Sequence, residues 1–298
     1  MNKNDITIIA PCYNEEKNIN EFYLKIKKEL KKLKLNNYKF IFIDDGSVDT
    51  TWDKILELSK KDKKIDAIQL VRNFGHQNAI SSALPFISSN YTLFIDVDMQ
   101  DPPELLTQMY KKIKEKKINI VYGKRIKSNE GFFKKFFSKI FYSVFNIFSH
   151  TKIPSDVSDF RLIDENVVKA LIKFKEQDPF LRGIVSWLGF KSLPINFVRN
   201  KRSRGSSGWS NKKMINFSIS AFMGFSTFPM RLSFYISFIL ILFLIFLGLY
   251  ALYTYSQGVN IPGWTSLFMV MIIFFIIQFF ILGLISEYTG RIYNEVKN

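Results

Sequence analysis

The chain has 298 residues, which is the size of one or two domains and enough for a hydrophobic core. Its 42 Lys and Arg outnumber its 26 Asp and Glu, giving a formal net charge of +16, yet no Asp, Glu, Lys or Arg occurs between Leu232 and Ser286. Because Cys12 is the single cysteine and His76 and His150 are the two histidines, the composition excludes a disulfide framework and a zinc site of His and Cys ligands.

Strands and helices are expected to alternate along the N-terminal part of the chain. Apolar and β-branched runs predict strands at 6–10, 40–43, 67–71, 92–95 and 118–122, and helices at 15–35, 49–58, 77–87 and 103–116. Such alternation predicts right-handed βαβ units. We therefore expect an α/β fold with a Rossmann-like, mostly parallel sheet and helices on both faces.

Polar residues that packing does not explain follow four of these strands. They are Tyr13, Asn14 and Glu15 after the first, Asp44 and Asp45 after the second, Arg72 and Asn73 after the third, and Asp96, Asp98 and Gln100 after the fourth. Because ligands of open α/β sheets bind beyond the carboxyl ends of the strands, these turns point to one site. Carboxylates there can bind a base or ribose, N–H groups near Gly75 can approach a phosphate, and Asp96 with Asp98 can hold a metal on a diphosphate.

Two alternatives stay open for these acidic residues, and two enzyme classes are disfavoured. Asp45 with Gly46 is also typical of a simple turn, and Asp49 of a helix cap. The chain contains neither G-x-x-x-x-G-K-[ST] nor G-x-G-x-x-G. P-loop ATPases and dinucleotide dehydrogenases are therefore not expected.

Four motifs occur in order along this part of the chain. They are Ala10-Pro11-Cys12-Tyr13-Asn14-Glu15-Glu16, Asp44-Asp45-Gly46-Ser47, Arg72-Asn73-Phe74-Gly75 and Asp96-Val97-Asp98-Met99-Gln100-Asp101-Pro102-Pro103-Glu104. Together they resemble the motifs of family 2 glycosyltransferases of the GT-A fold, and more narrowly those of the polyisoprenyl-phosphate glycosyltransferases, the group of dolichol-phosphate mannose synthase and bactoprenol glucosyltransferase. The resemblance extends over about residues 6–231.

This resemblance implies roles for individual residues. It implies nucleotide contacts from Pro11, Tyr13, Asn14, Glu15, Asp44, Asp45, Arg72, Gly75, Asp96 and Val97. It places Asp44 at the base, and it implies that Asp96, Asp98 and Gln100 coordinate Mg²⁺ or Mn²⁺. Simple packing by Tyr13 remains the alternative to a ligand contact.

A second acidic motif, Asp156-Val157-Ser158-Asp159-Phe160-Arg161-Leu162, resembles the family motif whose last carboxylate lies near the reacting anomeric carbon. The resemblance assigns this role to Asp159, with Asp156 as the second candidate. A phosphate oxygen is already an anion near pH 7 and needs little help from a base, so orientation of the sugar or acceptor by Asp159 is an open alternative to base catalysis. The alternative without a catalytic role is that Asp159 is an ordinary cap before a helix.

Basic residues further along resemble acceptor and diphosphate contacts. The residues concerned are Arg125, Lys135 and Ser138, which correspond to lipid-phosphate contacts, and Arg199, Arg202 and Ser207, which correspond to a flexible loop that clamps the diphosphate. A basic loop facing a membrane is the alternative for the second set. Gly208 stands where members of the resembling family often have lysine, which weakens the transfer of a specific sugar preference to this chain.

Apolar residues at helical spacing with lysines opposite predict an amphipathic helix at 132–150, which we expect at a membrane interface; a core-facing surface helix is the alternative. The segments 232–255 and 264–286 are each long enough to cross a bilayer. A buried core hairpin is less consistent with their all-round apolar surface. Basic residues precede the first segment and follow the second, and the loop between the two segments has none. Both ends of the pair are therefore expected on the cytoplasmic side.

We therefore expect a cytoplasmic GT-A domain at 1–210, a juxtamembrane helix at 211–230, a transmembrane hairpin at 231–288 and a cytoplasmic tail at 289–298. The only early apolar run, 6–12, is too short for a signal peptide.

The expected activity is inverting sugar transfer from a nucleotide-diphosphate donor to polyisoprenyl (undecaprenyl) phosphate at the inner membrane, for cell-surface glycans. UDP is favoured because the two-span arrangement resembles the bactoprenol enzymes. The alternatives are a transferase that extends a glycan or lipid-linked saccharide, disfavoured because Gln-x-x-Arg-Trp is absent, and a non-catalytic membrane scaffold. Nucleic acid is not an expected partner, since anionic lipid explains the basic charge. A homo-oligomer stays open.

Overall fold

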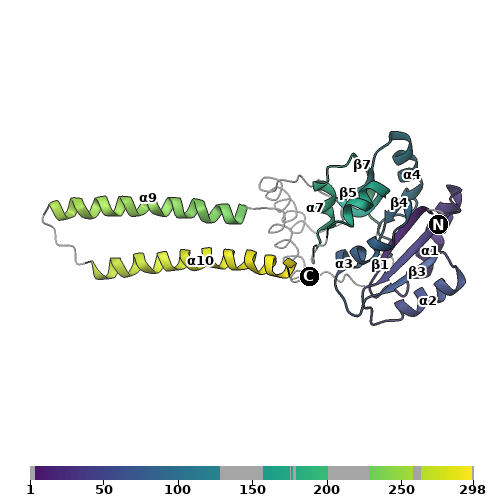
Figure 1. The fold of residues 1–298 in the computed structure, drawn as a ribbon, viewed down its shortest axis with the longest axis horizontal. Coiled ribbons are helices and arrows are strands. Elements are labelled where there is room, and N and C mark those ends of the chain that lie inside the picture. Colours follow the sequence, from purple (N-terminus) through teal and green to yellow (C-terminus); the bar gives the residue numbers. More distant parts are fainter. Residues whose placement is uncertain are drawn as a thin grey trace. The chain divides into compact units, whose positions relative to one another are not determined.

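A computed structural model describes residues 4–127, 157–174, 176, 179–200, 228–257 and 263–296. These residues belong to two units, an α/β unit and a C-terminal helix pair (Figure 1). Asp156, Lys135, Ser138, Arg202 and Ser207 lie outside the described residues, as do the expected interfacial helix at 132–150 and nearly all of the expected juxtamembrane helix.

The α/β unit is built on one mixed sheet. Its described strands are β1 (Asn4–Cys12), β2 (Tyr38–Asp44), β3 (Ile65–Gln69), β4 (Ser89–Phe94), β5 (Ile120–Lys127), β6 (Val157–Asp164) and β7 (Ser192–Val198). They are ordered β3-β2-β1-β4-β6-β5-β7. All neighbouring pairs are parallel except those made by β6, which is antiparallel to β4 and β5. The expected mostly parallel α/β sheet is thus confirmed.

The helices between the strands bury one apolar face each. They are α1 (Ile19–Lys32), α2 (Thr51–Lys61), α3 (His76–Ala83), the 3₁₀ turn η1 (Leu84–Phe86), α4 (Leu105–Lys116), α6 (Glu165–Leu171) and α7 (Leu181–Trp187). In α1, Phe22, Ile26 and Leu30 recur at a spacing of four and are fully buried. Phe22 packs edge-on against Phe42 of β2, with ring centroids 6.0 Å apart. Burial of each such side chain contributes about 1.5–3 kcal/mol.

The reversed strand β6 determines where the site can form. Phe94 at the end of β4 pairs with Arg161 of β6 in antiparallel register. Residues that precede Arg161 therefore lie beyond the carboxyl end of β4, on the side of the turn that carries Asp96. The start of β6, with Ser158 and Asp159, consequently reaches the same edge of the sheet as the ends of β1, β2 and β3.

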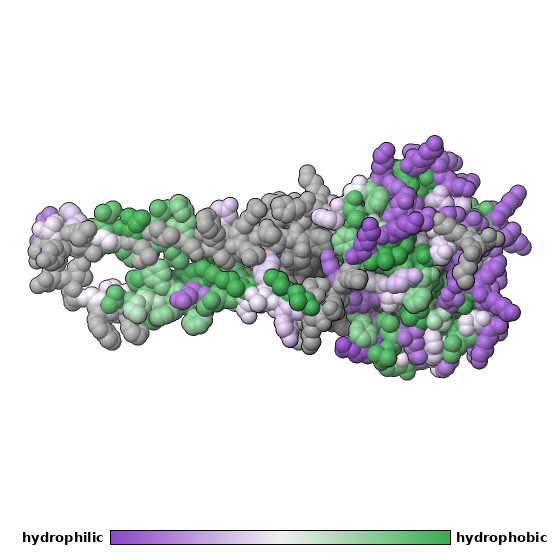
Figure 2. Space-filling view, viewed as in Figure 1, coloured by the Kyte–Doolittle hydropathy of each residue, from purple (hydrophilic) through white to green (hydrophobic). Residues whose placement is uncertain are grey.

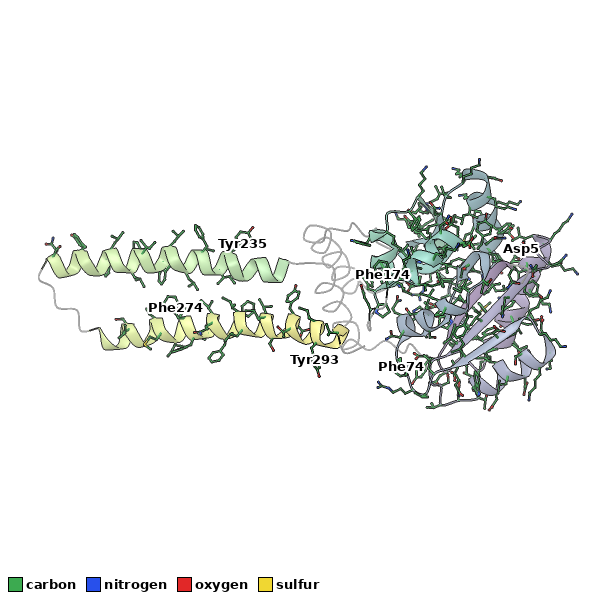
Figure 3. All side chains as sticks on the ribbon, viewed as in Figure 1. Asp5, Phe74, Phe174, Tyr235, Phe274 and Tyr293 are labelled. Carbon is green, nitrogen blue, oxygen red and sulfur yellow. The ribbon has the colours of Figure 1, made fainter. Side chains whose placement is uncertain are left out.

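The C-terminal unit consists of α9 (Phe228–Ser256) and α10 (Trp264–Val296), which contact each other. Their described surface is dominated by apolar side chains (Figure 2), which project from both helices (Figure 3). Among the described residues, 270–290 of α10 is the one segment long and apolar enough to cross a membrane, at 21 residues or about 30 Å. The apolar stretch 238–250 of α9 is shorter, so the expected second span is not confirmed.

Candidate active site

The turns after β1 and β2 are tied together by hydrogen bonds. The Asn14 N–H donates to Ser47 Oγ at 2.9 Å, and Asn14 Oδ1 accepts from the Val48 N–H at 2.9 Å. Asn14 adopts a positive φ of 56°, which Asn tolerates better than most residues. Glu15 is buried and accepts from Asn18 Nδ2 at 2.5 Å. The structure thus places Asn14 and Glu15 in contacts that shape the edge of the site.

Two other residues expected at the nucleoside differ in accessibility. Tyr13 is 39% exposed, so its ring is accessible to a ligand. Pro11 is buried in β1. Its contribution to a ligand site is therefore to shape the strand end.

Asp44 ends β2, and one of its two carboxylate oxygens is unpaired. The side chain is fully buried, and Oδ1 accepts from the Ser47 N–H at 3.2 Å. Oδ2 has no hydrogen-bond partner among the described residues. An unpaired buried acceptor is costly, so Asp44 Oδ2 is a candidate acceptor for a ligand N–H or O–H.

Asp45 fixes the turn between β3 and α3. Its two oxygens accept from the N–H groups of Phe74 at 2.8 Å and Gly75 at 3.0 Å. Gly46 has φ +67°, and a Cβ there would lie 2.4 Å from the Arg72 carbonyl carbon. The Gly75 N–H, expected near a phosphate, is therefore engaged by Asp45. Arg72 is exposed, with its guanidinium 4.5 Å from the Phe74 ring centroid.

The turn after β4 alternates buried and half-buried side chains. Val97 and Met99 are buried in the core, whereas Asp96, Asp98 and Gln100 are half-buried. The Gln100 N–H donates to Asp98 Oδ1 at 3.0 Å. The side chain of Val97, expected at the nucleotide, instead packs inward because it belongs to the apolar half of this alternation.

His76, the first residue of α3, binds Asp96. Its Nε2 lies 2.6 Å from Asp96 Oδ1. Burial opposes protonation of the ring, but the charge of Asp96 and this hydrogen bond outweigh burial and raise the pKa of His76 to about 9. Burial likewise opposes ionisation of Asp96, and His76 reverses the effect and lowers the pKa of Asp96.

Asp159 at the start of β6 is surrounded by donors. Arg182 of α7 binds it through Nε to Oδ1 at 2.8 Å and Nη2 to Oδ2 at 2.6 Å. Arg161 Nη2 lies 3.4 Å from Oδ1, and Gln77 Nε2 lies 3.3 Å from Oδ2. Burial alone would raise the pKa of Asp159, but the charge and hydrogen bonds of Arg182 hold it well below its usual range.

A second cluster contains two arginines around one carboxylate. Ser158 Oγ donates to the buried Asp101 at 2.7 Å, and Arg125 Nη2 donates to Ser158 Oγ at 3.1 Å. Burial lowers the pKa of Arg199, and the like charge of Arg125 lowers it further. The Nε atoms of Arg125 and Arg199 have no hydrogen-bond partner among the described residues. Two neighbouring guanidiniums, each with an unpaired buried Nε–H, are a candidate site for a phosphate.

The described residues contain no group of three or more His, Cys, Asp or Glu side chains arranged to hold a metal. Within the described part of the chain, the candidate oxygen ligands for a cation at this edge of the sheet are Asp96, Asp98 and Gln100, all half-buried. This donor set fits Mg²⁺ or Mn²⁺ that arrives with a diphosphate, because such ions are commonly bound by one or two carboxylates plus substrate phosphate oxygens.

Comparisons with known proteins identify the family of the chain. The model of glycosyl transferase family 2 matches residues 7–172. The chain belongs to glycosyl transferase family 2. It is 38% identical to an uncharacterized glycosyltransferase of Bacillus subtilis, YkcC, over 98% of this chain and 90% of that protein. It is 32% identical to the bactoprenol glucosyl transferase of Shigella phage SfII, over 98% of this chain and 95% of that protein.

A solved structure supports the fold of this family 2 glycosyltransferase. Glucosyl-3-phosphoglycerate synthase of Mycobacterium tuberculosis, in complex with Mn²⁺, UDP and phosphoglyceric acid, has a TM-score of 0.50 at 16% identity. The match covers 74% of this chain and 76% of that one. The expected GT-A-like α/β fold and the assignment as a transferase are both confirmed.

Several residues of the candidate site are not evident from the sequence motifs. The resemblance assigns no role to His76, Gln77 or Arg161, and none to Arg182 or Asp101. His76 and Gln77 directly follow the Arg72–Gly75 motif, so their position after a strand was a usable signal. Arg182 follows no predicted strand, and its contact with Asp159 depends on long-range packing.

Proposed function

We propose that the chain transfers a sugar from a nucleotide-diphosphate donor, with UDP favoured, to polyisoprenyl (undecaprenyl) phosphate at the cytoplasmic face of the membrane. One juxtaposition supports it best: the acidic turn of Asp96 and Asp98 adjoins the arginine pair of Arg125 and Arg199. The Asn200 N–H donates to the Gln100 carbonyl at 3.0 Å, which ties the end of β7 to that turn. A donor with a metal-bound diphosphate and an anionic acceptor need these two charge types side by side.

On the donor side, Asp44 would offer its unpaired buried oxygen as an acceptor for the base. Asp96 and Asp98 would hold Mg²⁺ or Mn²⁺, which neutralises charge on the leaving diphosphate. The proposed role of Tyr13 is to cover the nucleoside. The UDP preference is supported by the UDP complex of the solved family-like fold and by the bactoprenol-named relatives.

On the acceptor side, Arg125 would bind the lipid phosphate. Arg199, which the resemblance assigned to the donor diphosphate, would join it there, because the two guanidiniums are close enough for the charge of Arg125 to lower the pKa of Arg199. One of its oxygens forms a bond to the anomeric carbon while the bond from that carbon to the diphosphate breaks, which inverts the configuration. The acceptor oxygen is already ionised, so no proton needs to be removed. Because Arg182 holds the pKa of Asp159 well below its usual range, the carboxylate is a weak proton acceptor, and we assign it to orienting the sugar hydroxyls or acceptor instead of base catalysis.

The membrane part of the proposal is a two-helix anchor formed by α9 and α10. Exposed apolar side chains cover both helices, which is unusual for a water-facing surface. Tyr235 lies near the start of α9 and Tyr293 near the end of α10 (Figure 3), and such aromatic residues favour the interfacial region of a bilayer. Arg231 and Arg291 at the same ends favour the cytoplasmic side.

The test is a transfer assay with purified full chain, undecaprenyl phosphate, Mg²⁺ or Mn²⁺ and radiolabelled UDP- and GDP-sugars. We expect label in the organic phase only with the lipid phosphate and the metal, and none with Asp98→Ala. Asp66→Ala is the matched control, because Asp66 lies on β3 and pairs with Lys39 at 2.5 Å. Transfer that persists in Asp98→Ala, or label that enters saccharide acceptors alone, contradicts the proposal.

A further inference from the structure

Two consecutive residues of α3 connect the two acidic motifs. His76 Nε2 lies 2.6 Å from Asp96 Oδ1, and Gln77 Nε2 lies 3.3 Å from Asp159 Oδ2. The Gln77 amide also lies 3.3 Å from His76 Nδ1. A single helical turn thus contacts both the carboxylate assigned to the donor metal and the carboxylate assigned to the sugar or acceptor.

The position of this turn is fixed from both ends. Before it, Asp45 accepts hydrogen bonds from the N–H groups of Phe74 and Gly75, and Gly75 turns the chain with φ +97°. After it, the Leu181 N–H of α7 donates to Gln77 Oε1 at 3.2 Å. That bond directs the Gln77 NH₂ group toward Asp159 and the His76 ring.

We propose that His76 is the positioning residue of the donor metal site: it holds Asp96 by Oδ1 and so presents Oδ2 as the oxygen that binds Mg²⁺ or Mn²⁺. This inference rests on the proposed function and deepens it. A carboxylate cannot donate a hydrogen to His76 in its ionised form, so the Nε2–H donates whether the ring is neutral or charged. Groups that orient a metal-binding carboxylate in this way strengthen metal binding about 10–100-fold.

The geometry also explains why Asp96 needs such a partner. Among the described residues the site lacks a third carboxylate or imidazole arranged as a metal ligand. With so few protein ligands, affinity depends strongly on how well each one is oriented. His76 is half-buried, with a side chain 28% exposed, so its ring is held in the site.

The test measures Mn²⁺ affinity of the full chain in detergent with saturating UDP, from the electron paramagnetic resonance signal of free Mn²⁺. We expect His76→Ala and His76→Asn to bind Mn²⁺ at least tenfold more weakly, because neither side chain reaches Asp96. His76→Gln should bind within about threefold of wild type, since its Nε2 can occupy the position of the imidazole Nε2. Asn78→Ala is the matched control, because Asn78 donates to the Phe74 carbonyl on the same turn and touches neither aspartate in the described contacts.

Thermal unfolding of each variant separates a local effect from a folding defect. If His76→Ala fails to fold, the comparison of His76→Asn with His76→Gln decides, because both keep a polar side chain in the site. Equal Mn²⁺ affinity in that pair overturns the proposal, as does wild-type affinity in a folded His76→Ala. If the wild-type chain binds Mn²⁺ with UDP but transfers no sugar, the proposed function is contradicted. The role of His76 is still decided by the Mn²⁺ affinities of the variants. Lack of Mn²⁺ binding by wild type overturns both.

Discussion

Arg182 binds Asp159 through two parallel hydrogen bonds, Nε to Oδ1 at 2.8 Å and Nη2 to Oδ2 at 2.6 Å. The arrangement joins the start of β6 to α7 across 23 residues of chain. A guanidinium fork of this kind fixes the plane of the carboxylate as well as its charge. Asp159 is thereby a fixed, ionised acceptor at the carboxyl edge of the sheet.

Replacing Arg182 with alanine should destabilise the α/β unit by about 2 kcal/mol. This is below the 3–5 kcal/mol typical of a fully buried pair that loses one partner, because the Arg182 side chain is 22% exposed. The measurement is the midpoint of thermal unfolding in detergent. Lys169→Ala removes an exposed pair with Glu165 and should change stability by less than about 0.5 kcal/mol. Equal midpoints for the two variants would show that the fork adds nothing.

The same pair predicts the response to acid. Arg182 holds the pKa of Asp159 in the folded protein below its ordinary value. The ion pair therefore stabilises the folded state fully at a pH above that ordinary pKa, and this stabilisation is lost as the pH falls toward the folded-state pKa. Wild type should therefore lose stability on acidification below about pH 4 more steeply than Arg182→Ala. Unfolding midpoints between about pH 3 and 6 provide the comparison. If the unfolding midpoints of wild type and Arg182→Ala change with pH in parallel, the ion pair does not link stability to the ionisation of Asp159.

The turns after β2 and β3 offer a matched pair of glycines. Gly46→Ala should be clearly destabilising, because its Cβ would lie 2.4 Å from the Arg72 carbonyl carbon at a φ of +67°. Gly75→Ala has an unusual φ of +97° as well, but nothing lies within 4 Å of its Cβ. We expect a loss of about 1–2 kcal/mol for Gly75→Ala from backbone strain and a larger loss for Gly46→Ala. Urea unfolding of both variants tests the order, and the reverse order would contradict the close approach of the two turns.

Much of this site was predictable because it is encoded locally. Asp44, Asp96 and Asp98 each follow an apolar strand, and strand ends of a parallel sheet meet at one edge. The reversal of β6 was not predictable in this way, because its direction depends on pairing between Phe94 and Arg161, far apart in the chain. Val97 shows that membership of a motif does not fix where a side chain points. It lies between Asp96 and Asp98 in a motif expected at the nucleotide, but its apolar side chain is buried in the core.

Arg125 provides a test of the acceptor site itself. Arg125→Ala should raise KM for polyisoprenyl phosphate about tenfold to a hundredfold, since hydrogen bonds to charged groups contribute about 1.5–3 kcal/mol. The affinity for Mn²⁺ with UDP should stay close to wild type, because the described contacts of Arg125 are with Ser158 and Asp101. Lys124→Ala is the matched control, because it removes a neighbouring cation of β5, whereas the described contacts with Ser158 and Asp101 come from Arg125. A rise in the dissociation constant for UDP with no change in the KM for the lipid would instead place Arg125 at the donor diphosphate. The assignment of Arg125 to the acceptor phosphate would then be wrong.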